Sequence, residues 1–260
     1  MDPRCQSIRA NILKASHSSG HGHIPTSFSI IECLVAVYEV MRHDPKRPDW
    51  PERDKFVLSK GHASLGYYGV LSSFGYFLAE DMLTFGGFMS NYGCHADRLK
   101  ARGVEASTGS LGHGIGIATG MALGSKIHGS KSRVFTLIGD GESNEGTVWE
   151  AVMVANNNNL NNLTIIYDHN KSQGRCMPLD KPVERFSSFG CDVEMIDGHD
   201  LPALRTALAR QSDRVRVIVA DSVKGYGCRT LVDNMYEWHR RSPNAEELGK
   251  LMEELHAPAV

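Results

Sequence analysis

The stretch VFTLIGDGESNEG, residues 134–146, decides the predicted fold. Four of its first five residues are apolar, which predicts a strand buried on both faces. The strand runs directly into Gly139-Asp140-Gly141, and the pattern predicts a helix from residue 146 onward. A buried strand, a glycine-rich turn and a helix are typical of one unit of a parallel α/β sheet, in which ligands bind beyond the carboxyl ends of the strands. The carboxylate of Asp140 is therefore a candidate ligand-binding group.

The same alternation of strands and helices runs along the rest of the chain. Strands are predicted at 55–59, 133–138, 163–168, 193–197 and 216–221, and helices at 27–41 behind a Thr26/Ser27 cap, 112–127, 146–157, 201–211 and 244–255. Asparagine dominates ANNNNLNNL (155–163), which predicts a helix end and a loop. We therefore expect an α/β fold, with a doubly wound, mostly parallel sheet and helices on both faces. No internal repeat or low-complexity linker divides residues 1–260, so a single domain is expected.

Composition points to an ordinary soluble protein in a reducing compartment. The chain has 28 basic and 30 acidic residues, so neither nucleic acid nor an anionic membrane surface is expected as a partner. Its longest mostly apolar run, FSIIECLVAVYEVM, contains Glu32 and Glu39 and is too short to span a bilayer. The N-terminus MDPRCQSIRA does not resemble a signal peptide. Six cysteines without a CxxC pair suggest neither a zinc site nor a disulfide framework, so the predicted location is cytoplasmic.

Asp140 has a counterpart at the end of the next predicted strand. Between Gly141 and Asn170 there are 28 residues, which is the length of one helical crossover to an adjacent strand. A carboxylate, an amide oxygen and a nearby main-chain carbonyl suit Mg²⁺ or Ca²⁺, with phosphate oxygens completing the shell. Gly141 has no side chain, so its N–H can approach a phosphate closely. For an isolated Gly-Asp-Gly a purely structural turn is the alternative, and the pairing with Asn170 favours the ion site.

Five motifs, in the right order, resemble those of transketolase, a thiamine-diphosphate enzyme. GDGESNEG (139–146) resembles GDG-x-x-x-E-G of the family, and YDHN (167–170) resembles YDDN. The other three are DKFVLSKGHAS (54–64), VEASTGSLGHG (104–114) and EWHRRSPNAEE (237–247). Together they cover most of the chain, and as an ordered set they are far more specific than a lone Gly-Asp-Gly.

The resemblance implies a cofactor and a metal site. Asp140 and Asn170 are expected to bind Mg²⁺, or alternatively Ca²⁺, through their side chains, and Ser172 through its main-chain carbonyl. The residues expected to bind thiamine diphosphate are His62, Gly109, Ser110, Leu111, Gly139, Asp140, Gly141, Glu142, Asn170 and His239. Glu145 matches a carboxylate that the family uses for communication between subunits.

The resemblance also implies which histidines handle the substrate. Transketolase cleaves a ketose beside its carbonyl and adds the two-carbon unit to an aldose, and imidazole suits the proton transfers near neutral pH. The expected catalytic histidines are His23, His62, His95 and His239, with His21 as the alternative to His23. Three departures from the family pattern, His113, His169 and Ile24, are expected near the substrate channel, and they leave the donor and acceptor sugars open.

The matched motifs belong to only one part of a transketolase, the diphosphate-binding domain. The sequence therefore resembles the N-terminal subunit of a split transketolase, which needs a separate C-terminal subunit with the pyrimidine-binding and C-terminal domains. We expect the chain alone to be a homodimer that pairs through the glycine-rich helix 112–127, and a heterotetramer to be the active form. Alternatively, these glycines only pack the helix on its own sheet. Other functions left open are a deoxyxylulose-phosphate-synthase-like subunit, a 2-oxo-acid dehydrogenase subunit, and a non-catalytic cofactor-binding module.

Overall fold

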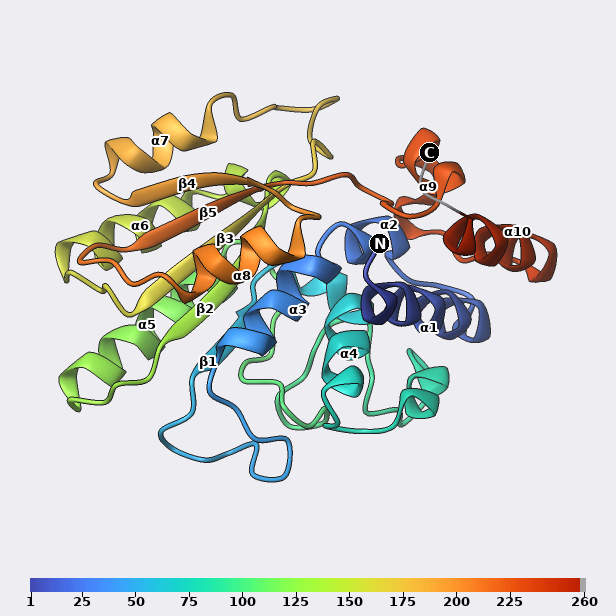
Figure 1. The fold of residues 1–260 in the computed structure, drawn as a ribbon, viewed down its shortest axis with the longest axis horizontal. Coiled ribbons are helices and arrows are strands. Elements are labelled where there is room, and N and C mark those ends of the chain that lie inside the picture. Colours follow the sequence, from blue (N-terminus) through green and yellow to red (C-terminus); the bar gives the residue numbers. More distant parts are fainter. Residues whose placement is uncertain (258–260) are drawn as a thin grey trace.

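A computed structural model describes residues 1–257 of the chain. Within them, a sheet of five strands has the order β1-β2-β3-β5-β4, and every neighbouring pair is parallel (Figure 1). The strands are β1 (Lys55–Leu58), β2 (Val134–Gly139), β3 (Leu163–His169), β4 (Asp192–Asp197) and β5 (Arg216–Asp221). The predicted α/β fold with a parallel sheet is therefore confirmed, and all five predicted strands are present, with ends that differ by at most one residue.

Helices connect these strands and cover them. The α-helices are α1 (Pro3–Ser19), α2 (Ile24–Phe28), α3 (Ile31–Val40), α4 (Ser64–Ser73), α5 (His113–Ile127), α6 (Gly146–Asn157), α7 (Pro182–Ser188), α8 (Leu201–Ala209), α9 (Arg229–Asp233) and α10 (Ala245–His256). Short 3₁₀ helices are η1 (Gly61–Ala63), η2 (Ala79–Thr84), η3 (Gly141–Asn144) and η4 (Glu237–Arg240). None of the helices within residues 1–257 has the length and apolar character that crossing a membrane requires.

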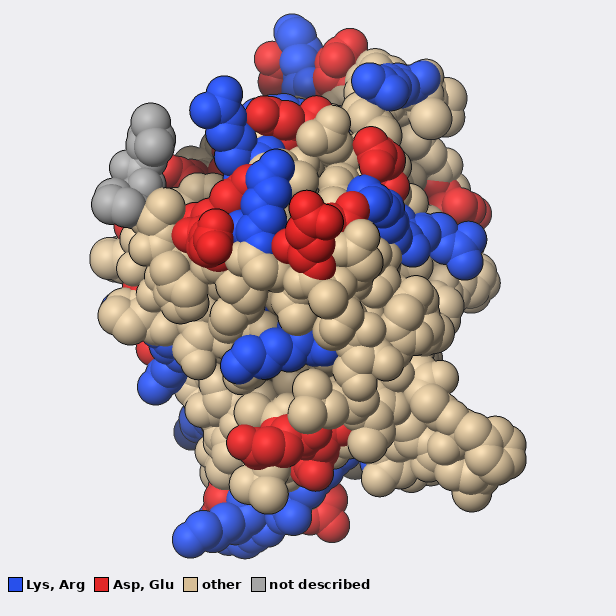
Figure 2. All heavy atoms as spheres, turned by 90° about the vertical axis from the view of Figure 1, so that its right-hand side faces the viewer, with Lys and Arg blue, Asp and Glu red and all other residues tan. Residues whose placement is uncertain are grey.

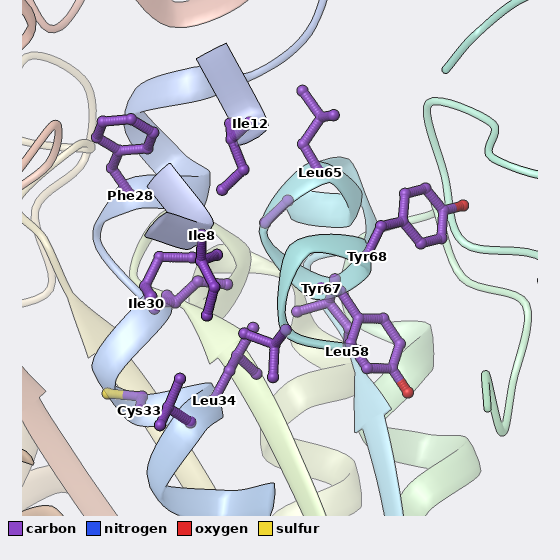
Figure 3. Close-up of a cluster of buried hydrophobic side chains, with 14 of the residues drawn as sticks. Ile8, Ile12, Phe28, Ile30, Cys33, Leu34, Leu58, Leu65, Tyr67 and Tyr68 are labelled. Carbon is purple, nitrogen blue, oxygen red and sulfur yellow. The ribbon is translucent and has the colours of Figure 1, made fainter. Parts of the chain in front are cut away.

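Two hydrophobic cores lie on opposite faces of the sheet. Helices α1, α3, α4 and α8 pack on one face with the side chain of Ile166, whereas α5, α6 and α7 pack on the other with its neighbours Ile165 and Tyr167. Figure 3 shows the first core, where Ile8 of α1, Leu34 of α3 and Leu58 of β1 converge. Because successive strand residues point to opposite faces, a strand covered on both faces must be apolar throughout. This explains why β2 and β3 lack an alternating pattern.

The predicted helix start at Thr26/Ser27 is wrong. The structure divides this region into α2 and α3, with Thr26 and Ser27 buried inside α2. The break between the two helices lets Ser29 donate a hydrogen bond to Asp168 (2.8 Å) and lets the Thr26 carbonyl accept one from Lys60 (3.1 Å). Tertiary contacts with the ends of β1 and β3 thus override the local helical pattern.

Several helices were not anticipated from the sequence, and α1 is the longest of them. Its start nevertheless has a local signal, because the Asp2 carboxylate accepts hydrogen bonds from the main-chain N–H groups of Arg4 and Cys5, and Pro3 occupies the first turn. Its end is marked by Gly20, which has φ of 72°. The asparagine-rich segment agrees with its prediction, since α6 ends at Asn157 and a loop follows.

Charges are mixed on the face of the molecule seen in Figure 2. Lysine and arginine side chains lie among aspartate and glutamate side chains, and neither sign forms a continuous patch in that view. Some of the buried charges are paired with a charge of the opposite sign. The guanidinium of Arg9, for example, donates to both carboxylate oxygens of Glu32 at 2.6 and 2.7 Å, and both residues are buried. Such a pair is tolerated in the interior because each charge compensates the other.

The glycines of α5 have two different roles. A Cβ at Gly114 would lie 2.5 Å from the Cα of Ser59, so this glycine is required for the packing of α5 on the end of β1. At Gly116, Gly120 and Gly124, by contrast, a Cβ would meet nothing within 4 Å. Packing on the sheet therefore accounts for Gly114, while the other three glycines lie on an open face of the helix.

This difference predicts opposite effects of alanine at a packed and at an open helical glycine. Gly114→Ala should lower the free energy of unfolding by about 1–3 kcal/mol, because main-chain atoms of Ser59 obstruct the new methyl group. Gly249→Ala in α10, where a Cβ would meet nothing within 4 Å, is the control and should raise it by about 0.5–1 kcal/mol, since alanine restricts the unfolded chain. Urea denaturation of both variants measures these values, and equal effects would contradict the packing described.

Candidate active site

Asp140 lies at the carboxyl end of β2 with a carboxylate that is only partly satisfied. Its Oδ1 accepts hydrogen bonds from the Gly141 N–H and the Ser172 hydroxyl, both at 2.7 Å. Its Oδ2 is buried and has no hydrogen-bond partner among residues 1–257. A buried carboxylate oxygen without a donor is costly, and a cation is the usual compensation. The residue therefore fits the metal that the family resemblance implies.

Asn170 follows β3 and lies close to Asp140 through their shared neighbour Ser172. Its amide nitrogen donates to Asp168 (2.7 Å) and to Ser29 (3.2 Å), which fixes the orientation of the amide group. The amide oxygen accepts from the main-chain N–H of Ser172 at 3.0 Å and has a second lone pair to offer. Asp140, Asn170 and Ser172 are thus brought together, as expected for a set of oxygen ligands.

A soft or histidine-rich metal centre finds no support in the described structure. Within residues 1–257, no group of three or more His, Cys, Asp or Glu side chains is placed to hold a metal ion. The oxygen donors around Asp140 instead suit a hard cation such as Mg²⁺ or Ca²⁺.

A fully buried ion pair lies beneath this region and was not anticipated. The Lys60 ammonium at the end of β1 contacts the Asp168 carboxylate of β3, and their side chains are 1% and 0% exposed. Lys60 also donates to the carbonyl (3.1 Å) and hydroxyl (3.2 Å) of Thr26. Asp168 accepts from the hydroxyls of Ser29 and Ser222 as well. The pair therefore ties β1, α2, β3 and the end of β5 together.

Glu142 was expected to bind the cofactor, and the structure gives its carboxylate other contacts. One oxygen accepts from the Ser59 hydroxyl (2.6 Å) and the Gly112 N–H (2.8 Å), and the other accepts from the Gly139 N–H (3.0 Å). Burial raises the pKa of this carboxyl, although the three donors oppose the shift. Because both oxygens accept hydrogen bonds from the protein, Glu142 positions β1, β2 and the start of α5, and its expected contact with the cofactor stays a prediction.

Three of the expected histidines form one cluster. The ring of His23 lies 5.1 Å from that of His62 and 5.3 Å from that of His239, measured between centroids. The rings of His62 and His239 are 6.2 Å apart. These residues come from the start of α2, from η1 and from η4, so three distant parts of the sequence converge. His21 lies elsewhere, with its ring 5.0 Å from Phe85.

The cluster is held neutral at physiological pH. Burial and the neighbouring Lys60 lower the pKa of His62 to about 2. Burial and the nearby His239 lower the pKa of His23 to about 4, and burial and Lys224 lower that of His239 to about 4. A neutral imidazole offers one N–H donor and one lone pair. Each ring can therefore donate one hydrogen bond to a hydroxyl group and accept another from it.

Lys224 fixes which nitrogen of His239 carries the proton. Its Nζ lies 3.1 Å from His239 Nδ1, and its side chain is buried. Burial, together with the charge of Lys60, lowers the pKa of Lys224 to about 8, so the ammonium form prevails at pH 7. An ammonium group can only donate, so Nδ1 must accept and neutral His239 carries its proton on Nε2. The sequence offered one unused signal, a lysine shortly after the end of β5.

The remaining expected residues lie around the cluster. His95 is exposed, and a Cβ at Gly109 would lie 3.3 Å from its ring. The same Gly109 closely approaches η1, because a Cβ at Gly61 would lie 2.8 Å from its nitrogen. Ser110 is exposed and Leu111 is half-buried. The 108–111 segment therefore runs between His95 and the segment that carries His62.

The three departures from the family pattern have different environments. His113 is exposed at the first turn of α5, and His169 is half-buried with its ring 5.9 Å from that of Tyr167. Ile24 is fully buried and follows His23 directly in the chain. The expected location of these three residues near the substrate channel stays a prediction.

Comparisons with known proteins agree with this arrangement. A family model described as transketolase, thiamine diphosphate binding domain, matches residues 3–256. The chain is 35% identical to an apulose-4-phosphate transketolase subunit of Actinobacillus succinogenes over 98% of its length and 95% of that protein. It is 37% identical to the 6-deoxy-6-sulfo-D-fructose transketolase subunit SqwG of a Clostridium species, over 85% of its length and 83% of that protein.

Solved structures give the same result at the level of the fold. A transketolase variant from Pichia stipitis superimposes with a TM-score of 0.90 at 26% identity, and covers 97% of this chain. Transketolase from Campylobacter jejuni superimposes with a TM-score of 0.85 at 28% identity, and covers 98%. This chain spans 40% and 43% of those two proteins, respectively.

The Asp140 oxygen without a hydrogen-bond partner in residues 1–257 leads to a prediction about the removal of this carboxylate. Asp140→Ala should abolish Mg²⁺-dependent binding of thiamine diphosphate, because it removes the charged ligand of the cation. Isothermal titration measures the affinity. Asp233→Ala, which removes an exposed carboxylate on α9, is the control and should bind normally. Retention of full affinity by Asp140→Ala would rule out the proposed ligand.

Proposed function

Because the chain belongs to the transketolase family, as a subunit that carries its thiamine-diphosphate-binding domain, we propose that it transfers a two-carbon ketol unit from a ketose to an aldose together with a separate C-terminal subunit. The observation that carries this proposal is the buried oxygen of Asp140, which has no partner within residues 1–257, at the edge of the sheet where the neutral histidine cluster also lies. The Asp140 carboxylate suits a cation, and the neutral histidines suit hydrogen bonds with the hydroxyl groups of a sugar.

We assign the cofactor and metal roles to residues of this edge. The side chains of Asp140 and Asn170 and the main-chain carbonyl of Ser172 hold Mg²⁺, or alternatively Ca²⁺. Gly139 and Gly141 bind the diphosphate, and Gly141 leaves room for it, because a Cβ there would meet nothing within 4 Å. His62, His239 and the segment 109–111 complete the cofactor contacts, and Glu142 supports them indirectly. Thiamine diphosphate, when bound, supplies the electron sink that cleavage beside a carbonyl requires.

The histidines bind the sugar and move its protons. His239 presents its Nε2–H as a donor, since Lys224 occupies Nδ1. His23 and His62 stay uncharged at pH 7, so each ring offers one N–H and one lone pair to the hydroxyl groups of the sugar. His95 lies at the exposed side of the 108–111 segment, where it can reach the more distant part of a substrate.

The names of the relatives support a transketolase over the other functions considered. Two relatives that this chain covers to 95% and 83% are named as transketolase subunits, which favours this reaction over those of a deoxyxylulose-phosphate synthase or a 2-oxo-acid dehydrogenase. A non-catalytic cofactor-binding module remains the second candidate function, and reconstitution with a partner distinguishes it.

The substrates we propose are modified sugars outside central metabolism. The relatives are named for apulose 4-phosphate and 6-deoxy-6-sulfo-D-fructose, which are unusual sugars with an anionic group. The replacements at His113 and His169 are further support, because they change polar groups around the candidate site. We therefore propose a ketose donor and an aldose acceptor that are phosphorylated or otherwise modified.

We propose that the partner is a C-terminal subunit with the pyrimidine-binding and C-terminal domains, and that this chain is one diphosphate-binding domain in the cytoplasm. Both hydrophobic cores pack on the same sheet, which supports a single domain. All six cysteines are free thiols, which supports the cytoplasm. Two copies should pair through the open face of α5, where Gly116, Gly120 and Gly124 lie beside the exposed Ile117. The active form is then a heterotetramer.

A reconstituted complex tests the reaction. Mixed with its C-terminal subunit, thiamine diphosphate and Mg²⁺, the chain should catalyse ketol transfer among a panel of phosphorylated and sulfonated ketoses and aldoses. Activity confined to xylulose 5-phosphate and ribose 5-phosphate would contradict the proposed substrate class. In the same complex His62→Ala or His239→Ala should lower turnover by about 10²–10⁴-fold while cofactor binding persists. His128→Ala, at the exposed end of α5, is the control and should be fully active.

Light scattering tests the assembly. The chain alone should be a dimer, and addition of the C-terminal subunit should give a heterotetramer. Gly120→Arg should convert the dimer to a monomer, because its side chain would protrude from the open face of α5 without a clash inside the chain. Gly249→Arg, at an equally open position of α10, is the matched control and should remain dimeric. A wild-type monomer that ignores the partner would refute this assembly.

A further inference from the structure

A chain of buried polar contacts leads from α1 to the turn that carries Lys224. Arg9 of α1 pairs with Glu32 of α3, and Glu32 Oε2 lies 3.1 Å from Nδ1 of His199. Nε2 of His199 then accepts a hydrogen bond from the main-chain N–H of Val223 at 2.9 Å. The side chain of His199 is only 6% exposed. Val223 is the immediate neighbour of Lys224, so this histidine holds the turn next to the candidate site.

The contacts of His199 permit one tautomer. Burial would raise the pKa of Glu32, but the Arg9 guanidinium and the hydrogen bond from His199 outweigh it and lower the pKa to about 2. The carboxylate can therefore only accept, and His199 Nδ1 must donate to it. The Val223 N–H can only donate, so Nε2 must be unprotonated. His199 is fixed as the neutral Nδ1–H form, and its ring stacks on that of Tyr226 at 3.6 Å and 10°.

The turn at 222–227 is fastened on both sides of Lys224. The Ser222 hydroxyl donates to the buried Asp168, and the Gly225 N–H donates to the carbonyl of Pro25 at 3.0 Å. Gly225 has φ of 88°, a conformation that favours glycine. His199 fastens Val223 between these two points. The turn thus presents the Lys224 ammonium to His239 in one defined position.

We propose that His199 is a positioning residue of the ketol-transfer site, which holds the 222–227 turn so that Lys224 stays against His239 and fixes its tautomer. This inference rests on the proposed function. His199 touches neither the histidine cluster nor the Asp140 region in any hydrogen bond or ring contact of residues 1–257, so it acts only through the turn.

Loss of His199 should alter the titration of His239 first. The charged and titratable groups around His239 are Lys224, Arg240, Lys60, His23 and His62. Of these, Lys224 contacts it directly. If the turn relaxes and the ammonium moves away, a like charge is removed, so the pKa of His239 rises and the ring protonates at higher pH. The acid limb of the activity profile should move in the same direction.

The experiment compares three variants of the full chain. His199→Phe keeps a flat ring for stacking but loses both hydrogen bonds, whereas His199→Gln retains one donor and one acceptor. His43→Phe is the matched control: His43 is half-buried, and its nitrogens lie 3.1 Å from the Tyr76 hydroxyl and 2.9 Å from the Tyr38 carbonyl, remote from the turn in sequence. Histidine-selective NMR follows the titration of His239, whose signal is assigned by its loss in His239→Gln.

We expect His199→Phe to raise the pKa of His239 by at least about one unit and to lower kcat in the reconstituted complex about tenfold. The affinity for thiamine diphosphate with Mg²⁺ should stay within a factor of about two, because the Asp140 region is untouched. In His199→Gln the pKa of His239 and kcat should both lie close to their wild-type values. His43→Phe should leave the His239 titration and kcat unchanged.

An unchanged His239 titration in folded His199→Phe would overturn the proposal, as would an equal effect of His43→Phe. If His199→Phe does not fold, a double-mutant cycle of His199→Ala, which removes both hydrogen bonds of the ring, with Lys224→Met replaces it. The two changes should then be non-additive in the pKa of His239, and strict additivity would refute the link. The titration needs no turnover, so a reconstituted complex without ketol transfer would refute the proposed function while leaving the positioning role open to this test.

Discussion

The ion pair between Lys60 and Asp168 is the interaction on which the candidate site depends. Both side chains are buried, so each charge is stable there only because the other is present and because hydroxyl and amide groups satisfy the remaining positions. The pair joins the carboxyl ends of β1 and β3, and through Ser222 it reaches the end of β5. It also fixes the amide of Asn170, which donates to Asp168 and must therefore turn its oxygen away. The orientation of the Asn170 amide oxygen, a proposed metal ligand, thus depends on a structural ion pair.

The polar groups of this edge form two sets with different tasks. Every charged oxygen or ammonium group of Asp168, Glu142 and Lys60 has a hydrogen-bond partner within the protein, so these residues define where the strand ends and turns lie. Asp140 and the neutral histidines retain unused lone pairs or N–H groups, so they are the ones that can act on a ligand. The groups with hydrogen-bond partners in the protein hold the strand ends in place. The groups with unused lone pairs or N–H groups can bind a ligand, because a buried polar atom without a partner is costly until a ligand compensates it. Glu142 and Asp140, only two residues apart, illustrate the distinction.

The two faces of α5 also differ in whether they are packed within the chain or open. The inner face of α5 packs Gly114 against β1, whereas the outer face leaves three glycines and Ile117 open. The chain also spans only two-fifths of the full-length transketolases it superimposes on, and the relatives of its own length are named as subunits. A site built at the edge of one sheet, with an open helix nearby, is consistent with a protein that completes its active site with another chain.

Local sequence was sufficient for the parallel sheet, for the helices at α5 and α6, and for the proximity of Asp140 and Asn170. Continuous apolar strands and the length of one crossover are properties of neighbouring residues, and parallel strands must bring their carboxyl ends to one edge. Only the tertiary structure decided that α2 and α3 separate and that His23 rather than His21 joins His62 and His239. It also decided that both carboxylate oxygens of Glu142 accept hydrogen bonds from the protein. The polar contacts of Lys60, Lys224 and His199 around the candidate site likewise appear only in the folded chain. The physical reason is that a buried charge or imidazole is defined by its partner, and these partners lie tens to hundreds of residues away along the chain.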